Sequence, residues 1–176
     1  LPGGGTLQAA VDAANPGDVL VLADGTYTVS GGSAVLTIAS WAPTGLTIRA
    51  ANPGQAVLDA QGVSGRRGVT ISGGIVTIED VEIMGGSEEL GGGVRIQGGT
   101  ATFNGCTIRN NQAADHGAHS SKGGGVVVEG GTAAFNSRII RNNQAADTPG
   151  EGVSGGRVRA QRQSATSRNT QRQPGW

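Results

Sequence analysis

Apolar and polar residues alternate in short runs along most of this 176-residue chain. In Val94-Arg95-Ile96-Gln97 every second residue is apolar, and the alternation returns at Ala101-Thr102-Phe103 and at Cys106-Thr107-Ile108-Arg109. A period of two is typical of a β-strand with one buried face. Gly98-Gly99 and Gly105 separate the runs and predict turns. This part of the chain is therefore predicted to form three short strands.

The same pattern then recurs. Residues 91–115 are repeated 32 residues later as 123–147, with seven differences in 25 positions. A repeat of this length indicates a solenoid, and three strands per repeat indicate one coil of a three-sided parallel β-helix. Because one coil cannot bury its inward face alone, the copies should stack in register. The expected columns place Val126, Val128, Ala133, Phe135 and Ile140 over Val94, Ile96, Ala101, Phe103 and Ile108.

An earlier and more diverged copy covers residues 68–83, at an offset of 25 residues. The longer later repeat is explained by a loop at 113–122 that leaves one corner of the coil. Residues 45–50 and 56–62 are expected to be the third strand of one coil and the first of the next. These copies predict an all-β fold of roughly five coils. The inward residues of the earlier copy would be Val69, Ile71, Val76, Ile78, Val81 and Ile83.

Polar residues occupy two of the inward positions in these columns. Asn110 and Asn142 are the next inward residues after Ile108 and Ile140, if the alternation continues. Stacked asparagine amides bond to one another, so these two are predicted to form a structural ladder. Arg138 occupies a position that is apolar in the earlier copies. Because burying an unpaired guanidinium has a prohibitive free-energy cost, either Arg138 reaches solvent or the register shifts there.

The N-terminal residues follow a different pattern. Leu7 and Val11 share one face of a predicted helix over about 6–14, with Thr6 as its N-cap and Pro16-Gly17 after its end. Such a helix would cap the first coil, because solenoids need their ends covered.

The run "LQAAVDAANPGDVLVLADGTY", residues 7–27, resembles the opening of the pectate-lyase-like right-handed parallel β-helix superfamily. The similarity extends over about residues 4–148 and implies that the β-helix is right-handed. It implies no single function, since these coils serve lyases, hydrolases and structural surface proteins. The "GGGV" runs also loosely resemble repeats of polymorphic outer-membrane proteins, although the F-x-x-N element of those repeats is not met at Phe103.

Composition separates the chain into two parts. Residues 1–150 carry eight basic and twelve acidic residues and are predicted to form the β-helix, whereas residues 151–176 carry five arginines and one acid. The tail has almost no apolar alternation and reads as disordered, either as a natural cap or as a truncated or frame-shifted continuation. No basic stripe indicates nucleic acid, and no apolar stretch approaches the ~20 residues of a membrane span. The single cysteine, Cys106, excludes an internal disulfide and reads as a core residue.

Few residues are candidates for chemistry. Lyases of the resembled superfamily abstract a proton beside a uronate carboxylate, which needs an arginine or lysine base and a Ca²⁺ or other cation. Arg95, Arg109 and Arg141 are expected to form one outward column, with Glu82 nearby, and these four are the candidate ligand-binding residues. No catalytic residue and no cofactor is assigned, and Ca²⁺ enters only if the chain is a lyase. The H-x-x-H of His116 and His119 is not taken as a metal site, because the later copy has no counterpart.

Two functions follow from these observations. The first is a non-catalytic extracellular or cell-surface β-helix module, structural or glycan-contacting. Its partners would be an acidic polysaccharide or another surface protein, and its uncapped C-terminal coil could allow end-to-end stacking. The alternative is the N-terminal part of a polysaccharide lyase, or of a related carbohydrate-active enzyme, whose catalytic coils are missing. Whether the chain is an enzyme is left open, with the non-enzymatic reading favoured.

Overall fold

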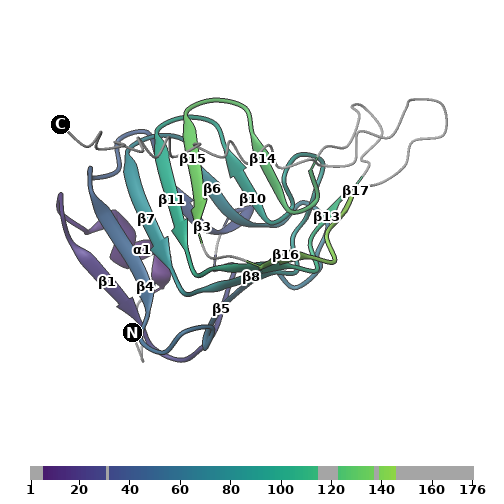
Figure 1. Ribbon diagram of the computed structural model, residues 1–176, viewed down its shortest axis with the longest axis horizontal. Helices are drawn as coiled ribbons and strands as arrows, with labels where there is room; N and C mark the ends of the chain where they lie inside the picture. Colours follow the sequence, from purple (N-terminus) through teal and green to yellow (C-terminus); the bar gives the residue numbers. More distant parts are fainter. Residues whose placement is uncertain (1–5, 31, 115–122, 137–138, 146–176) are drawn as a thin grey trace, which may run out of the picture.

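Short strands joined by tight corners wind into a parallel β-helix, as the computed structural model shows (Figure 1). The structure describes residues 6–30, 32–114, 123–136 and 139–145. Sheet A contains β1 (Val19–Leu22), β4 (Leu46–Ala50), β7 (Ile75–Glu79), β11 (Thr100–Asn104) and β15 (Thr132–Asn136). Sheet B contains β2 (Gly25–Thr28), β5 (Ala56–Asp59), β8 (Glu82–Met84), β12 (Thr107–Arg109) and β16 (Ile139–Arg141).

The remaining strands form the third side and one corner. Sheet C contains β3 (Ala34–Ile38), β6 (Arg67–Ile71), β10 (Val94–Ile96) and β14 (Val126–Val128). The short sheet D contains β9 (Ser87–Glu88), β13 (Gln112–Ala113) and β17 (Gln144–Ala145). The chain visits sheets A, B and C in turn, with sheet D inserted between B and C from the third coil onward. In the part of the chain that the structure describes, no helical segment has the length and hydropathy of a membrane span.

The predicted register between the copies is confirmed. Val94 pairs with Val126, Phe103 with Phe135 and Ile108 with Ile140, all in parallel strands. The earlier copy also lies as predicted, because Val69, Ile78 and Ile83 pair with Val94, Phe103 and Ile108. The expected places of residues 45–50 and 56–62 were wrong by one side. The strands there, β4 and β5, belong to sheets A and B. In the repeat that begins at Gly91 these sheets hold the second and third strands, so β4 and β5 are the second and third sides of one coil.

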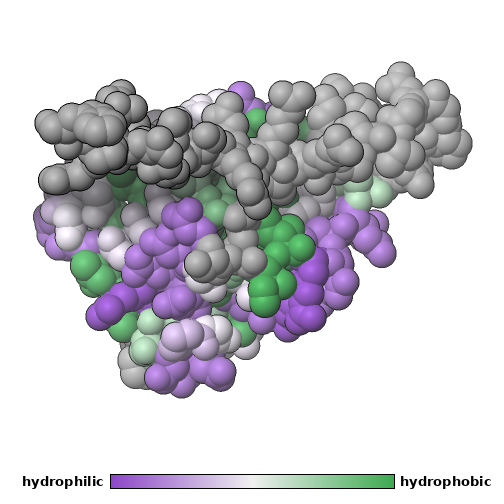
Figure 2. All heavy atoms as spheres, viewed as in Figure 1, coloured by the Kyte–Doolittle hydropathy of each residue, from purple (hydrophilic) through white to green (hydrophobic). Residues whose placement is uncertain are grey.

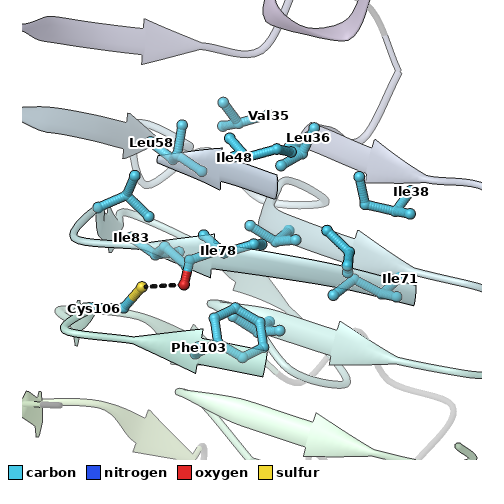
Figure 3. Close-up of a cluster of buried hydrophobic side chains, with 14 of the residues drawn as sticks. Val35, Leu36, Ile38, Ile48, Leu58, Ile71, Ile78, Ile83, Phe103 and Cys106 are labelled. Atoms are coloured by element: carbon cyan, nitrogen blue, oxygen red, sulfur yellow. Dashed lines mark hydrogen bonds between the residues drawn. The ribbon is translucent and has the colours of Figure 1, made fainter. Parts of the chain in front are cut away.

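Inward side chains from all three sides fill a single core (Figure 3). Leu36, Ile48 and Leu58 come from different sheets of the first coils and are fully buried. Cys106 is also buried, and its thiol donates to the carbonyl oxygen of Ile78 at 3.3 Å (Figure 3). The interpretation of Cys106 as a core residue is therefore confirmed.

The predicted N-terminal helix is present as α1 (Leu7–Asp12). The hydroxyl of Thr6 accepts from the amide of Ala9, which satisfies one of the free N–H groups at the helix start. Leu7 and Val11 are buried against the core. The amide of Gln8 both donates to the carbonyl oxygen of Thr37 and accepts from its N–H. Gln8 thus satisfies backbone groups on β3, the edge strand of sheet C, and the helix caps that edge.

The corner between sheets B and D corrects the predicted asparagine ladder. Asn110 and Asn142 take left-handed backbone conformations, with φ of 54° and 53°, and both are exposed. A left-handed residue interrupts the alternation, so the next residue points inward. The hydrogen-bonded pair is therefore Asn111 and Asn143, one position later than predicted.

The Asn111 side chain serves two coils at once. Its Oδ1 accepts from the N–H of Gly86 in the coil before, at 2.9 Å. Its Nδ2 donates to the carbonyl oxygens of Ile83 and Arg109 and to Oδ1 of Asn143. The N–H of Asn111 in turn donates to Oδ1 of Asn143, which repeats the bond made by Gly86. This buried amide satisfies backbone groups that a sharp corner would leave without partners.

Replacing Asn111 by alanine should lower the free energy of unfolding by about 2–3 kcal/mol, because buried backbone groups lose their partners. The matched variant Asn110→Gly should stay within about 0.5 kcal/mol, since glycine accepts the left-handed conformation and Asn110 is exposed. Urea denaturation of both variants measures the difference. Equal losses at the two positions would contradict the corrected ladder.

The two phenylalanines should differ in their contribution to stability. Their rings stack with centroids 4.9 Å apart, but Phe103 is fully buried and Phe135 only partly. Phe103→Ala should cost about 3–5 kcal/mol and Phe135→Ala about 1–2 kcal/mol, because less apolar area is lost at Phe135. Chemical denaturation would reject this assignment of the core if Phe135→Ala were the more damaging change.

Candidate functional site

The outward face of sheet B brings three of the four candidate residues together. Nη2 of Arg109 lies 2.5 Å from Oε1 of Glu82, and both side chains are mostly shielded from solvent. Arg141 pairs in register with Arg109 on the neighbouring strand and is exposed. Within the described part of the chain, Arg141 has no ion-pair partner. Two arginines therefore lie in register on adjacent strands, and Glu82 binds one of them.

Arg95, the fourth candidate, lies elsewhere. It belongs to β10 in sheet C, in register with Thr70 and Val127, and so it is not in the column of Arg109 and Arg141. The expectation of one arginine column was wrong. Its Nε lies 2.5 Å from Oε2 of Glu129. Alternation tells which residues face outward, but not on which of the three sides.

Sheet A carries a neutral and acidic ladder on its outer face. Asn104 donates to Glu79 in the coil before it, and Asn136 donates to Asn104, each at 3.0 Å. All three residues are in register on adjacent strands. Outward polar side chains therefore bond from coil to coil, as the buried asparagines do at the corner.

Arg67 was not among the candidate residues that the sequence indicated. It begins β6 and is only 5% exposed. Its Nε and Nη2 each donate at 2.8 Å to carbonyl oxygens, those of Gly91 and Leu90, and Nη2 lies 3.5 Å from Glu88. Burial lowers the pKa of Arg67, while Glu88 opposes that shift. The sequence contained one indication that Arg67 is unusual. The later copies carry glycine, Gly92 and Gly124, at the positions aligned with it.

The contacts of Arg67 indicate a structural role. They hold the segment between β9 and β10 against the start of β6, where the coil turns from sheet D into sheet C. A buried guanidinium whose donors meet carbonyl oxygens and a carboxylate has little freedom to bind a ligand.

Groups that could hold a metal ion were sought among the same residues. In the described ranges, no three or more His, Cys, Asp and Glu side chains are grouped to hold one. His116 and His119 lie outside the described residues, as does Arg138. The predicted boundary at residue 150 and the tail 151–176 lie outside them too.

A comparison with known protein families matches residues 3–167 to the family described as Pel9A-like, right handed beta helix region. The match covers most of the chain. The chain belongs to this family.

The Pel9A-like family assignment agrees with the predicted resemblance to the pectate-lyase-like β-helix superfamily and gives the helix its right-handed sense. No curated protein and no solved structure matches the chain. The family description names a fold region, so it establishes a β-helix module.

Cys106 should be inert in this Pel9A-like chain. Burial raises the pKa of its thiol to about 11, so almost no thiolate forms at neutral or mildly alkaline pH. A thiol reagent at pH 8 should therefore react slowly with the folded protein and rapidly after unfolding in urea. Rapid labelling of the folded protein would show that Cys106 is accessible, against its burial in the core.

Proposed function

We propose that this protein is a non-catalytic extracellular or cell-surface β-helix module that contacts an acidic polysaccharide through sheet B. The observation that carries the proposal is the register pairing of Arg109 with Arg141 on the outer face. Strands in a sheet lie about 4.8 Å apart, so two positive groups are held close together. Like charges placed opposite each other destabilise a sheet, and an anion bound between them relieves that repulsion.

The chemistry of the side chains favours carboxylates as the anion. A guanidinium presents paired N–H donors in a plane and binds a carboxylate through two parallel bonds. A polyuronate carries a carboxylate on each sugar, so one chain can reach both arginines. Glu82 holds Arg109 in place and leaves the exposed Arg141 to make the stronger contact with the polymer.

The ion pairs support a binding role over a catalytic one. A general base must reach the substrate proton with an unoccupied atom. Nη2 of Arg109 already contacts Glu82, and Nε of Arg95 contacts Glu129. Ion-paired arginines of this kind are better suited to holding positive charge at the surface for a ligand than to accepting a proton. Cys106 contributes no nucleophile, because it is buried in the core.

Replacing Arg141 by alanine should weaken binding to polygalacturonate about two- to five-fold, because exposed charge pairs contribute only ~0–1 kcal/mol each. The matched control is Arg49→Ala, which removes an exposed arginine from sheet A. Affinity electrophoresis in gels containing polygalacturonate measures both, and the retardation should fade as salt is added.

Two outcomes would contradict the proposal. Equal losses for the Arg141 and Arg49 variants would mean that net charge, and no site on sheet B, governs binding. Release of an unsaturated, ultraviolet-absorbing product from polygalacturonate with Ca²⁺ would make the chain a lyase, the alternative function.

A further inference from the structure

Exposed apolar side chains gather on sheet A. Among the described residues, seven large hydrophobic side chains are exposed. Three of them lie on sheet A: Val19 and Val21 on β1, and Ile75 at the start of β7. A fourth, Trp41, lies in the turn that leads into β4 and is the most exposed of the seven, at 68%. Figure 2 shows hydrophobic patches between hydrophilic ones on one side of the molecule. Clustered exposed apolar residues indicate a contact surface.

The outer face of sheet A also repeats hydroxyl groups from coil to coil. Its central column is in register across five strands, and a second column runs beside it across three. Neither column contains a charged residue. Each threonine offers a hydroxyl and a methyl group. The central column is Val19, Thr47, Thr77, Thr102 and Ala134, and the second is Ile75, Thr100 and Thr132.

Local structure holds Trp41 in solvent. The N–H of Ala42 donates to the carbonyl oxygen of Ala39, which closes a turn around Ser40 and Trp41, and Ala42 itself is buried. In the next coil this corner is made by Gly73 and Gly74, which pack on Ser40 and Ala42. At this corner the neighbouring coil has two glycines, which carry no side chains, and the indole of Trp41 is largely exposed.

We propose that the outer face of sheet A binds a neutral polysaccharide, with one sugar ring stacked on Trp41. The ligand class follows from the repetition: threonine hydroxyls recur at the strand spacing of about 4.8 Å, which suits a polymer that repeats its own hydroxyl groups. Both columns are uncharged. The charged residues of the same face, Arg49 and Glu79, are opposite in sign and lie in register in the column beside them, so the face as a whole suits a neutral chain better than a uronate. The methyl groups and Ile75 pack on the apolar faces of sugar rings, as the indole does. The inference extends the glycan contact proposed above to a second face.

The experiment uses the full chain in affinity gels that contain a soluble neutral polysaccharide, with hydroxyethylcellulose, galactan and xyloglucan as probes. The wild type should be retarded by at least one of them, and salt should change that retardation little. Trp41→Ala should reduce the apparent affinity at least five-fold, and Thr77→Val/Thr102→Val should reduce it by a smaller factor. Valine keeps the shape and strand preference of threonine and replaces the hydroxyl with a methyl group.

Matched controls come from the other sides of the helix. Val63→Ala removes an exposed apolar side chain from the turn between β5 and β6, and Thr107→Val makes the same isosteric change on sheet B. Both should leave the retardation unchanged. Thermal melting of every variant shows whether the fold is retained, which is expected because all the altered side chains are at least partly exposed.

The inference and the proposed function fail separately. Retardation by polygalacturonate without retardation by any neutral probe would overturn the inference alone, and the reverse would overturn only the sheet B site. Unaltered retardation of Trp41→Ala and of the double threonine variant would also overturn the inference. So would a loss of self-association in Trp41→Ala without any glycan binding, because that result would give the face to a second copy of the chain.

Discussion

The structure depends on the stacking of one coil on the next. A coil of this protein is too thin to bury its inward side chains, and its backbone groups point along the helix axis toward the neighbouring coils. Parallel pairing satisfies both needs at once, because each added strand supplies hydrogen-bond partners and a matching layer of apolar side chains. The near-identity of residues 91–115 and 123–147 is a consequence, since a side chain that packs in one layer packs in the next.

Corners are where this arrangement is hardest to maintain. At the corner between sheets B and D, a left-handed residue turns the chain, and the next residue, Asn111, bonds to backbone groups of its own coil and of the coil before. Arg67 does the same for the segment between β9 and β10. Gln8 does it for the edge of β3 at the N-terminal end. In each case a side chain replaces the partner that a regular strand would have provided.

The same stacking creates the surfaces on which function is proposed. Stacking in register also repeats parts of the outer face, so Arg109 is paired with Arg141, and Thr77 lies in a column with Thr102. Repeated surface groups suit repeated ligands, which is why both proposals concern polysaccharides. The two faces carry different side chains, an arginine pair on sheet B and threonine columns on sheet A. A β-helix can therefore present separate chemistries on separate sides without altering its core.

The sequence by itself determined the fold class, the N-terminal helix and the pairing of the repeated copies. These features depend on local alternation and on the repeat, and both are written in the order of residues. It did not determine which side of the helix a residue occupies, because that depends on how sharply each corner turns. One left-handed residue moved the ladder from Asn110 to Asn111, and the order of the sides separated Arg95 from Arg109 and joined it to Glu129. The threonine column was hidden for the same reason, since Thr47 and Thr77 meet Thr102 only once coils of unequal length are stacked.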